Sequence, residues 1–282
     1  MRTARDRSST SSASEPRWAR VAELAPAPPA APAGRDVLAR LGELKRLAIV
    51  PAFNEEASVG HVIDEIRAFD PGFEIAVVDD GSTDRTAGVA ADRGVHVIRL
   101  PFNLGIGGAM QTGYRYAFEQ GFDVAVQVDG DGQHDPGQLA LILEPVLEGQ
   151  ADLVVGSRFA GGGAYRSTAA RRIGIRIFAG VVPAVVRQRL TDTTSGFRAV
   201  NRKGIALFAA DYPHDYPEVE ATVMCVKHKL RLTEVPVEMR ERSGGRSSIT
   251  AFRSIYYMTK VLLAIFVGLF RRYAVPLEEE HR

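Results

Sequence analysis

From Leu47 onward, the sequence alternates short apolar runs with segments in which apolar residues recur at helical spacing. In chain order the expected elements are a strand at 47–51, a helix at 58–69, a strand at 74–80, a helix at 83–94, a strand at 95–100, a helix at 107–121, and strands at 124–129 and 153–158. Strands that alternate with helices of this length form βαβ units. The sequence therefore predicts an α/β fold with a mostly parallel, doubly wound sheet.

Composition excludes some classes of function. Among 282 residues, Lys plus Arg is 35 and Asp plus Glu is 34, so no global positive field points to a nucleic-acid partner. The single cysteine, Cys225, rules out an internal disulfide and a Cys-rich zinc site, and it suits a reducing cytosol. A small buried apolar residue is the expected role of this cysteine.

Three regions differ in composition. Residues 1–44 are rich first in Ser and then in Pro and Ala, which predicts a disordered leader that ends in a short helix at 37–44. No long apolar stretch follows the first arginines, so a secretory signal peptide is not expected and the catalytic part should face the cytoplasm. Residues 45–250 form the expected α/β domain, and 251–282 form a C-terminal helix and tail.

Ligands of doubly wound sheets bind beyond the carboxyl ends of the strands. Polar or small residues follow each expected strand here, at 51–56, 79–81, 103–108 and 129–131. The sequence therefore predicts a binding site along this edge of the sheet.

The acidic stretch Q-V-D-G-D-G-Q-H-D-P begins at Gln127. In an unbent strand, Asp129 and Asp131 would point the same way, with Gly130 between them open to a ligand. Carboxylates this close repel each other unless a cation lies between them, and oxygen ligands select Mg²⁺ or Mn²⁺. A surface Asp-Gly turn is the alternative. His134 is interpreted as a structural hydrogen-bonding residue, and Asp135 as a helix cap.

Two further loops bear on nucleotide binding. In V-V-D-D-G-S-T-D, at 77–84, Ser82 or Thr83 is expected to cap the next helix, which leaves Asp79 and Asp80 for a nucleobase or ribose. The glycines of N-L-G-I-G-G-A-M, at 103–110, fit the dinucleotide fingerprint poorly, and no phosphate-binding Gly-Lys-Ser/Thr loop is present. A hydride-transfer dehydrogenase is therefore disfavoured.

Two segments suggest contact with an anion or a membrane. A Gly-rich stretch at 161–163 precedes a basic amphipathic segment with arginines at positions 166, 171, 172 and 176, which indicates either a flap over an anion or lipid surface or a solvated helix face. The apolar run 255–270 contains Lys260 and is shorter than the roughly 20 residues of a spanning helix. An interfacial helix is expected there, with a membrane partner or burial as alternatives.

Six motifs in order carry a family resemblance: P-A-F-N-E-E from 51, V-V-D-D-G-S-T-D from 77, N-L-G-I-G-G-A from 103, Q-V-D-G-D-G-Q-H from 127, G-S-R-F from 156 and T-S-G-F-R from 194. Together they closely resemble family 2 glycosyltransferases, especially the polyprenyl- (dolichol-) phosphate mannose synthase group, over about 47–248. The resemblance implies a GT-A fold, a nucleotide-diphospho-sugar donor, a divalent metal and an inverting transfer.

The resemblance also implies roles for residues at matching positions. Those that would line the nucleotide or its base are Pro51, Phe53, Glu55, Val78, Asp80 and Gly130. The metal would be held by Asp129, Asp131 and Gln133, and Arg158 and Arg172 would lie near donor and lipid-phosphate oxygens.

The closing motif of the family has a partial counterpart near the end of the sequence. Arg242, Gly245 and Ser247 match it, but Ser248 stands where a lysine is expected, and Arg246 is the candidate replacement for the missing charge.

The expected reaction is displacement at the anomeric carbon, with the metal, Asp131 and Arg158 at the departing diphosphate. A polyprenyl phosphate acceptor is already anionic and needs no strong base. A hydroxyl acceptor, such as a glycan, needs a carboxylate, for which Glu220 or Glu218 is the candidate, although both could simply begin a helix. A soluble transferase and a non-catalytic nucleotide-sugar-binding relative are the alternatives to a transferase on the inner face of the membrane, held there by peripheral contact or a membrane partner.

Overall fold

The computed structural model describes residues 34–160, 190–214 and 216–240. The strands are β1 (Arg46–Ala52), β2 (Glu74–Asp79), β3 (His96–Arg99), β4 (Val124–Gln127), β5 (Leu153–Ser157), β6 (Arg198–Asn201) and β7 (Leu232–Pro236). The helices are α1 (Gly34–Leu41), α2 (Val59–Phe69), α3 (Thr86–Ala91), α4 (Gly105–Glu119), the 3₁₀ turn η2 (Pro136–Gln138), α5 (Leu139–Leu147), α7 (Arg202–Ala210) and α8 (Pro217–Lys227).

The seven strands form one sheet in the order β3-β2-β1-β4-β6-β5-β7. Strands β1 to β4 pair in parallel, as do β5 and β7, whereas β6 runs antiparallel between β4 and β5. The predicted α/β class and mostly parallel sheet are therefore confirmed, and the antiparallel strand is an addition that the sequence did not predict.

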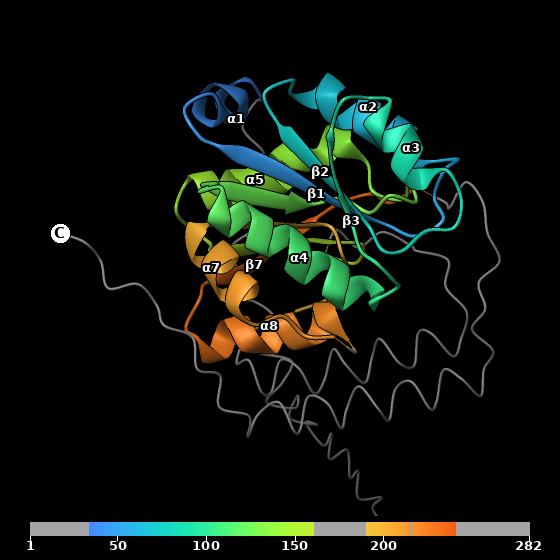
Figure 1. Ribbon diagram of the computed structural model, residues 1–282. Coiled ribbons are helices and arrows are strands. Elements are labelled where there is room, and N and C mark those ends of the chain that lie inside the picture. The colour runs from blue at the N-terminus through green and yellow to red at the C-terminus, as the bar shows by residue number, and fades with distance from the viewer. Residues whose placement is uncertain (1–33, 161–189, 215, 241–282) are drawn as a thin grey trace, which may run out of the picture. The chain divides into compact units, whose positions relative to one another are not determined.

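Alternate residues of the strands face opposite sides of the sheet, as the two-residue period of a strand requires. Leu47 and Ile49 of β1 pack against α4, α7 and α8 on one face. Ala48 and Val50 pack on the other face, which is covered by α1, α2, α3 and α5. Figure 1 shows these two helical layers with the sheet between them. Burial on both faces explains why the strands read as nearly continuous apolar runs.

The short helix expected at 37–44 is present as α1, three residues earlier. Val37 and Leu41 of this helix are buried in the same core cluster as the apolar residues of α5. The helix expected at 83–94 is shorter, because α3 spans only Thr86–Ala91.

Several expected features lie outside the described residues: the leader 1–33, the basic segment with Arg166, Arg171, Arg172 and Arg176, the closing motif from Arg242 to Ser248, and the C-terminal helix 255–270. Among the helices that the structure does describe, none has the length and apolar character needed to cross a membrane.

The antiparallel direction of β6 matters for the site. Arg198 begins β6 and pairs with Gln127, the last residue of β4. The segment that precedes β6 in the chain, 190–197, therefore reaches the same edge of the sheet as the loops that follow β1, β2 and β4.

Candidate active site

The loops after β1, β2 and β4 meet at the carboxyl edge of the sheet. The Asp80 amide donates to the Ala52 carbonyl at 2.9 Å, and the Gly130 amide donates to the Pro51 carbonyl at 3.2 Å. A Cβ atom on Gly130 would lie only 3.1 Å from that carbonyl oxygen, so glycine is the residue that fits this contact. Two of the predicted nucleotide-binding positions, Pro51 and Gly130, are thus in direct contact.

A double clasp joins the loop after β1 to the loop after β2. Asn54 has a positive φ of 56°, a conformation that asparagine tolerates better than most residues. Its amide donates to Ser82 Oγ at 2.9 Å, and its side-chain oxygen accepts from the Thr83 amide at 2.9 Å. Phe53, on the same loop, leaves 45% of its surface exposed. The clasp holds this aromatic ring at the rim of the candidate site.

Glu55 continues this clasp. Its amide donates to Thr86 Oγ1 at 2.8 Å, and its carboxylate accepts from Ser58 Oγ at 3.0 Å. The predicted nucleotide-lining glutamate is therefore held between α2 and α3, the two helices that follow the two loops.

The acidic stretch after β2 is held by contacts to neighbouring loops. Val78 is fully buried, so its side chain packs in the core. Asp79 is also buried and accepts from the Ser82 amide at 3.0 Å, while Asp80 accepts from the Leu104 amide at 2.7 Å. Both carboxylates therefore brace neighbouring loops.

The expected cap of α3 by Ser82 or Thr83 was wrong. No side chain at the N-cap position of α3 makes a capping bond, and the Asp84 carboxylate accepts from the Thr86 amide at 2.9 Å instead. Ser82 and Thr83 are engaged with Asn54, which explains why they do not cap the helix.

The chain bends between the two carboxylates of the predicted metal site. Strand β4 ends at Gln127, a turn covers 130 and 131, and Gly132 has a φ of +76°. Asp129 Oδ1 accepts from Gln127 Nε2 at 3.1 Å, and Asp131 Oδ1 accepts from the Gln133 amide at 3.0 Å. Strand alternation therefore does not set the direction of these carboxylates, which are oriented by local hydrogen bonds.

His134 supports this loop from beneath. It is 3% exposed and lies 5.0 Å from the Phe197 ring, and its Nδ1 atom accepts from the Asp129 amide at 3.0 Å. Because a backbone amide can only donate, the proton of the neutral ring is on Nε2. The structural role predicted for His134 is confirmed. Asp135 also caps as predicted, since its side chain accepts from the Gly137 amide at the start of η2.

The donor set suits a hard divalent ion that is shared with a substrate. Within 34–160, 190–214 and 216–240, no group of three or more His, Cys, Asp or Glu side chains is arranged to hold a metal. Asp129 is 33% exposed at its side chain and has one oxygen fixed by Gln127. Two carboxylates and the Gln133 amide oxygen leave coordination places that substrate phosphates can fill, so these residues fit Mg²⁺ or Mn²⁺.

The segment before β6 closes the other side of the acidic loop. A Cβ atom on Gly196 would lie 2.8 Å from Gln127 Nε2 and 3.1 Å from Asp129 Oδ2. The absence of a side chain at Gly196 thus allows the backbone of this segment to approach the proposed metal ligand.

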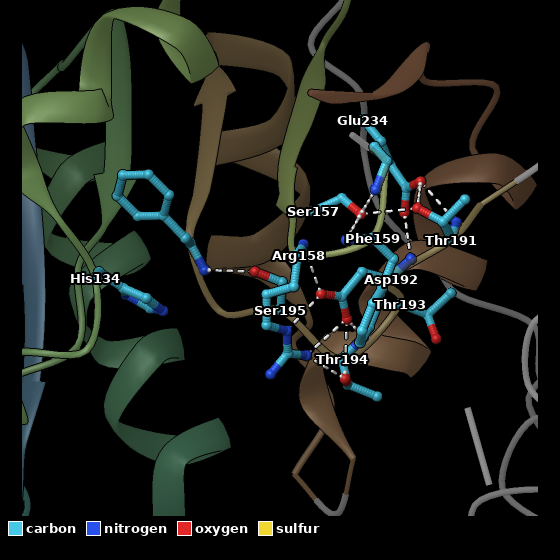
Figure 2. A network of polar contacts seen from close by, with 12 residues as sticks. His134, Ser157, Arg158, Phe159, Thr191, Asp192, Thr193, Thr194, Ser195 and Glu234 are labelled. Carbon is cyan, nitrogen blue, oxygen red and sulfur yellow. Dashed lines mark hydrogen bonds and ion pairs between the residues drawn. The ribbon is translucent and has the colours of Figure 1, made fainter. Parts of the chain in front are cut away.

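Arg158, predicted to contact phosphate oxygens, is held by the carboxylate of Asp192, for which the sequence predicted no role (Figure 2). Its Nε and Nη2 atoms donate to the two oxygens of Asp192 at 2.6 and 2.7 Å, and Nη2 also donates to Thr194 Oγ1 at 2.7 Å. Burial raises the pKa of Asp192, but the hydrogen bonds and charge of Arg158 outweigh burial and leave the pKa below its usual value. The guanidinium is therefore fixed in one orientation.

The two candidate bases, Glu218 and Glu220, both lie in the first turn of α8. Burial raises the pKa of Glu218, the Arg198 charge lowers it, and the Asp129 charge raises it further. Arg198 is fully buried and donates from Nη2 to the Glu218 carbonyl at 2.7 Å. Glu220 Oε1 accepts from the Tyr216 amide at 3.3 Å. The charge of Asp129 therefore acts on Glu218, which connects the start of α8 to the acidic loop.

Three residues of the site, Asp192, Arg198 and Glu234, had no predicted role. Asp192 precedes the T-S-G-F-R motif by two residues, and Arg198 ends that motif, but nothing in the spacing showed that both belong to the site. Glu234 lies on β7 and fixes the Asp192 loop from there, and its position in the sequence gave no sign of this contact. Two predicted residues, Arg172 and Arg242, lie outside the described residues.

Comparison with known proteins places this geometry in context. A family model described as Glycosyl transferase family 2 matches residues 47–207. An undecaprenyl-phosphate mannosyltransferase from Micrococcus luteus is 34% identical over 216 residues, which cover 73% of this chain and 88% of that protein. A polyprenol monophosphomannose synthase from Mycolicibacterium smegmatis is 30% identical over 240 residues, covering 81% and 90%.

Among solved structures, glucosyl-3-phosphoglycerate synthase from Mycobacterium tuberculosis, in complex with Mn²⁺, uridine diphosphate and glucosyl-3-phosphoglycerate, has a TM-score of 0.67. It is 20% identical, and the match covers 86% of each chain. At this identity the likeness concerns the fold, and it confirms the GT-A architecture expected from the sequence motifs.

Proposed function

The chain belongs to glycosyl transferase family 2 and is a glycosyltransferase; from this premise we propose that it moves a sugar from a nucleotide-diphospho-sugar to polyprenyl phosphate, with inversion at the anomeric carbon. The reaction depends on Mg²⁺ or Mn²⁺ and serves the synthesis of cell-envelope glycans. The enzyme works at the inner face of the cell membrane.

One observation carries the donor part of this proposal. The Gly130 amide donates to the Pro51 carbonyl at 3.2 Å, which brings the acidic loop against the loop that bears Phe53 and Glu55. A nucleotide bound at the loop that bears Phe53 and Glu55 therefore has its diphosphate beside Asp129 and Asp131. Carboxylates and phosphates repel each other unless a divalent ion bridges them, so this juxtaposition supports a metal shared by protein and donor.

In the proposed reaction, an oxygen of the acceptor phosphate forms a bond to the anomeric carbon while the bond from that carbon to the donor diphosphate breaks. The electron pair leaves with the nucleoside diphosphate. A divalent ion at this site supplies positive charge to the leaving group. Asp129, Asp131 and Gln133 would hold the ion, and Arg158 would donate hydrogen bonds to phosphate oxygens. An acceptor phosphate is already ionised, so no residue has to take a proton.

The acceptor is inferred from the relatives. Two proteins that match most of this chain are named for undecaprenyl phosphate and polyprenol phosphate as the molecules that they mannosylate. The basic segment with Arg172 and the apolar run 255–270 supply the charge and the apolar surface that a lipid-linked substrate needs. Together these features support a peripheral enzyme, held at the membrane by lipid or by a membrane protein.

A second candidate function is transfer to a hydroxyl group of a glycan or another soluble acceptor. The observation that favours it is the position of Glu218, a carboxyl group close enough to Asp129 and Arg158 for their charges to act on it. For a hydroxyl acceptor, Glu218 would take the proton as the oxygen attacks the anomeric carbon. For a phosphate acceptor it has no such task.

The test is release of nucleoside diphosphate by the purified chain from a panel of UDP- and GDP-sugars, with and without polyprenyl phosphate. We expect one donor to be consumed at least tenfold faster when polyprenyl phosphate is present. Consumption that depends on a water-soluble hydroxyl acceptor, and that Glu218→Gln abolishes, would favour the second candidate. Binding of nucleotide without turnover on any acceptor would identify a non-catalytic relative.

A further inference from the structure

A half-buried carboxylate on β7, that of Glu234, anchors the loop that holds Arg158. Both oxygens of Glu234 are engaged: Oε2 accepts from the amide and the hydroxyl of Thr191 at 2.6 and 2.8 Å, and Oε1 accepts from the Asp192 amide at 2.8 Å. Figure 2 shows Glu234 on one side of this loop and Arg158 on the other, with Asp192 between them. Residues 191 and 192 therefore cannot move without breaking bonds to Glu234.

Asp192, which Glu234 holds in place, in turn holds Arg158. Its carboxylate accepts from the Arg158 amide at 3.1 Å as well as from the guanidinium, so it fixes both the backbone and the side chain of Arg158. This ion pair is largely shielded from solvent, because the side chains of Arg158 and Asp192 are 11% and 1% exposed. An arginine fork held in this way keeps one orientation, since buried pairs are little screened by solvent.

Glu234 is also linked, through Thr191, to Ser157 at the end of β5. Ser157 Oγ lies 2.7 Å from Thr191 Oγ1, whose own proton goes to Glu234, so Ser157 is the donor of this bond. Ser157 Oγ in turn accepts from the Phe159 and Ala160 amides at 3.2 and 3.1 Å. The chain on both sides of Arg158 is thereby tied to Glu234.

This arrangement is unfavourable for stability alone. Burial raises the pKa of Glu234, and the nearby Asp192 charge raises it further, although the hydrogen bonds from Thr191 and Asp192 oppose the rise. A buried carboxylate, Asp192, and a half-buried one, Glu234, are thus brought together at one loop. Buried charges that could be replaced by well-packed apolar residues are weak evidence for stability, and they concentrate at functional sites.

We infer that Glu234 is a positioning residue, which holds Arg158 through Thr191 and Asp192 at the distance and angle needed to bind a phosphate group in the active site. This inference rests on the proposed function, in which Arg158 contacts phosphate oxygens. Arg158 and Asp129 both act electrostatically on Glu218, so Arg158 lies on the same side of the sheet edge as the proposed metal ligand.

The experiment is a double-mutant cycle in the full chain. Glu234→Gln keeps the shape of the side chain, but its amide nitrogen cannot accept from Thr191 or Asp192. We expect kcat/KM to fall about 10- to 100-fold, as for other supporting residues of active sites, while Mn²⁺ binding in the presence of nucleoside diphosphate changes less than about threefold. In an Arg158→Ala background, or Arg158→Lys if the alanine variant does not fold, Glu234→Gln should cost little more activity.

Asp152→Asn is the matched control. Asp152 is a buried carboxylate that accepts from the Arg231 amide and guanidinium at the opposite ends of β5 and β7, far along both strands from Ser157. This variant should lower the melting temperature without changing kcat/KM.

Two results would overturn the inference alone: a Glu234→Gln variant as active as Asp152→Asn, or an equal loss of activity with and without Arg158. A wild-type chain that transfers no sugar to any acceptor would refute the proposed function, and the inference with it.

Discussion

Gln127 offers the sharpest test of how the proposed metal site is built. Its Nε2 atom donates to Asp129 Oδ1 at 3.1 Å, and this bond fixes the direction of a carboxylate that would bind the ion. Replacement of Gln127 by Leu keeps the size of the buried side chain and removes the donor. Asp129 then keeps only the longer contact of its Oδ2 with His134 Nε2 at 3.6 Å, so more of its ordering must be supplied by the energy of metal binding.

The size of the effect follows from the bond. A hydrogen bond to a charged group contributes about 1.5–3 kcal/mol, and loss of a residue that orients a metal ligand weakens metal binding roughly 10- to 100-fold. Stability should respond differently. Gln127 Oε1 is buried without a hydrogen-bond partner among the described residues, so Leu at this position also removes an unsatisfied acceptor. We therefore expect the melting temperature to stay the same or to rise.

The assay is titration of Mn²⁺ into the protein by calorimetry, in the presence of saturating UDP or GDP. Gln138→Leu is the control, because Gln138 makes two bonds to the backbone of Glu238, at 2.7 and 2.8 Å, and none to Asp129. This control should lower stability and leave Mn²⁺ affinity unchanged. An affinity for Mn²⁺ in Gln127→Leu within about threefold of wild type would refute the role that we assign to Gln127.

Three further predictions concern single carboxylates. Asp131→Asn should reduce transfer at least about 100-fold with an unchanged circular dichroism melting curve; retained activity would exclude Asp131 as a metal ligand. Burial raises the pKa of Glu218, so the contribution of its protonated form to stability is lost as pH rises through the folded-state pKa. Glu218→Gln should therefore melt at a higher temperature than wild type at pH 7, and this gain should shrink toward pH 4.5. A lower melting temperature at pH 7 would contradict this. Burial raises the pKa of Asp152, but the hydrogen bonds and charge of Arg231 lower it to about 2 from 3.8. The contribution of Asp152 to stability is therefore present above pH 3.8 and lost as pH falls toward 2. Asp152→Asn should lower the free energy of unfolding by about 1–2 kcal/mol at neutral pH, after allowance for the exposed Arg231; a loss that persists below pH 2 in denaturant titrations would refute this.

The first half of the fold could be predicted because its pattern is local. Strands β1, β2, β4 and β5 are mostly buried and read as nearly continuous apolar runs, and each is followed by polar residues at one edge of the sheet. The edge strand β3 is only partly buried. Strands β6 and β7 gave weaker signals. The four residues of β6 include Arg198, which is fully buried although arginine is usually exposed, so hydropathy alone does not identify this strand.

The candidate site divides in the same way. Asp129, Asp131 and Pro51 belong to motifs that resemble a known family and are close in sequence to predicted strand ends. Other residues of the site come from distant segments: Asp192 from the loop before the antiparallel β6 and Glu234 from β7, which hold Arg158, and Glu218 from α8. Their contacts depend on the order of strands in the sheet, which periodicity does not encode.

The two candidate bases look equivalent in the sequence, since Y-P-E-V-E offers two glutamates with no means of separating them. In the structure both lie in the first turn of α8, where Glu220 accepts from the Tyr216 amide and Glu218 is acted on by the charges of Arg198, Asp129 and Arg158. These interactions of Glu218 depend on how α8 packs against the site, which the sequence pattern does not encode.

The central claim is that this chain forms a polyprenyl-phosphate-linked sugar in a reaction that requires a divalent ion. The direct measurement is mass spectrometry of the lipid extract after the purified chain is incubated with its preferred nucleotide-sugar and polyprenyl phosphate, with Mn²⁺ or with EDTA. We predict a product heavier than the acceptor by one sugar residue, absent with EDTA and restored by excess Mn²⁺. An unmodified lipid phosphate, in a sample that transfers the sugar to a hydroxyl acceptor and releases nucleoside diphosphate, would contradict the claim.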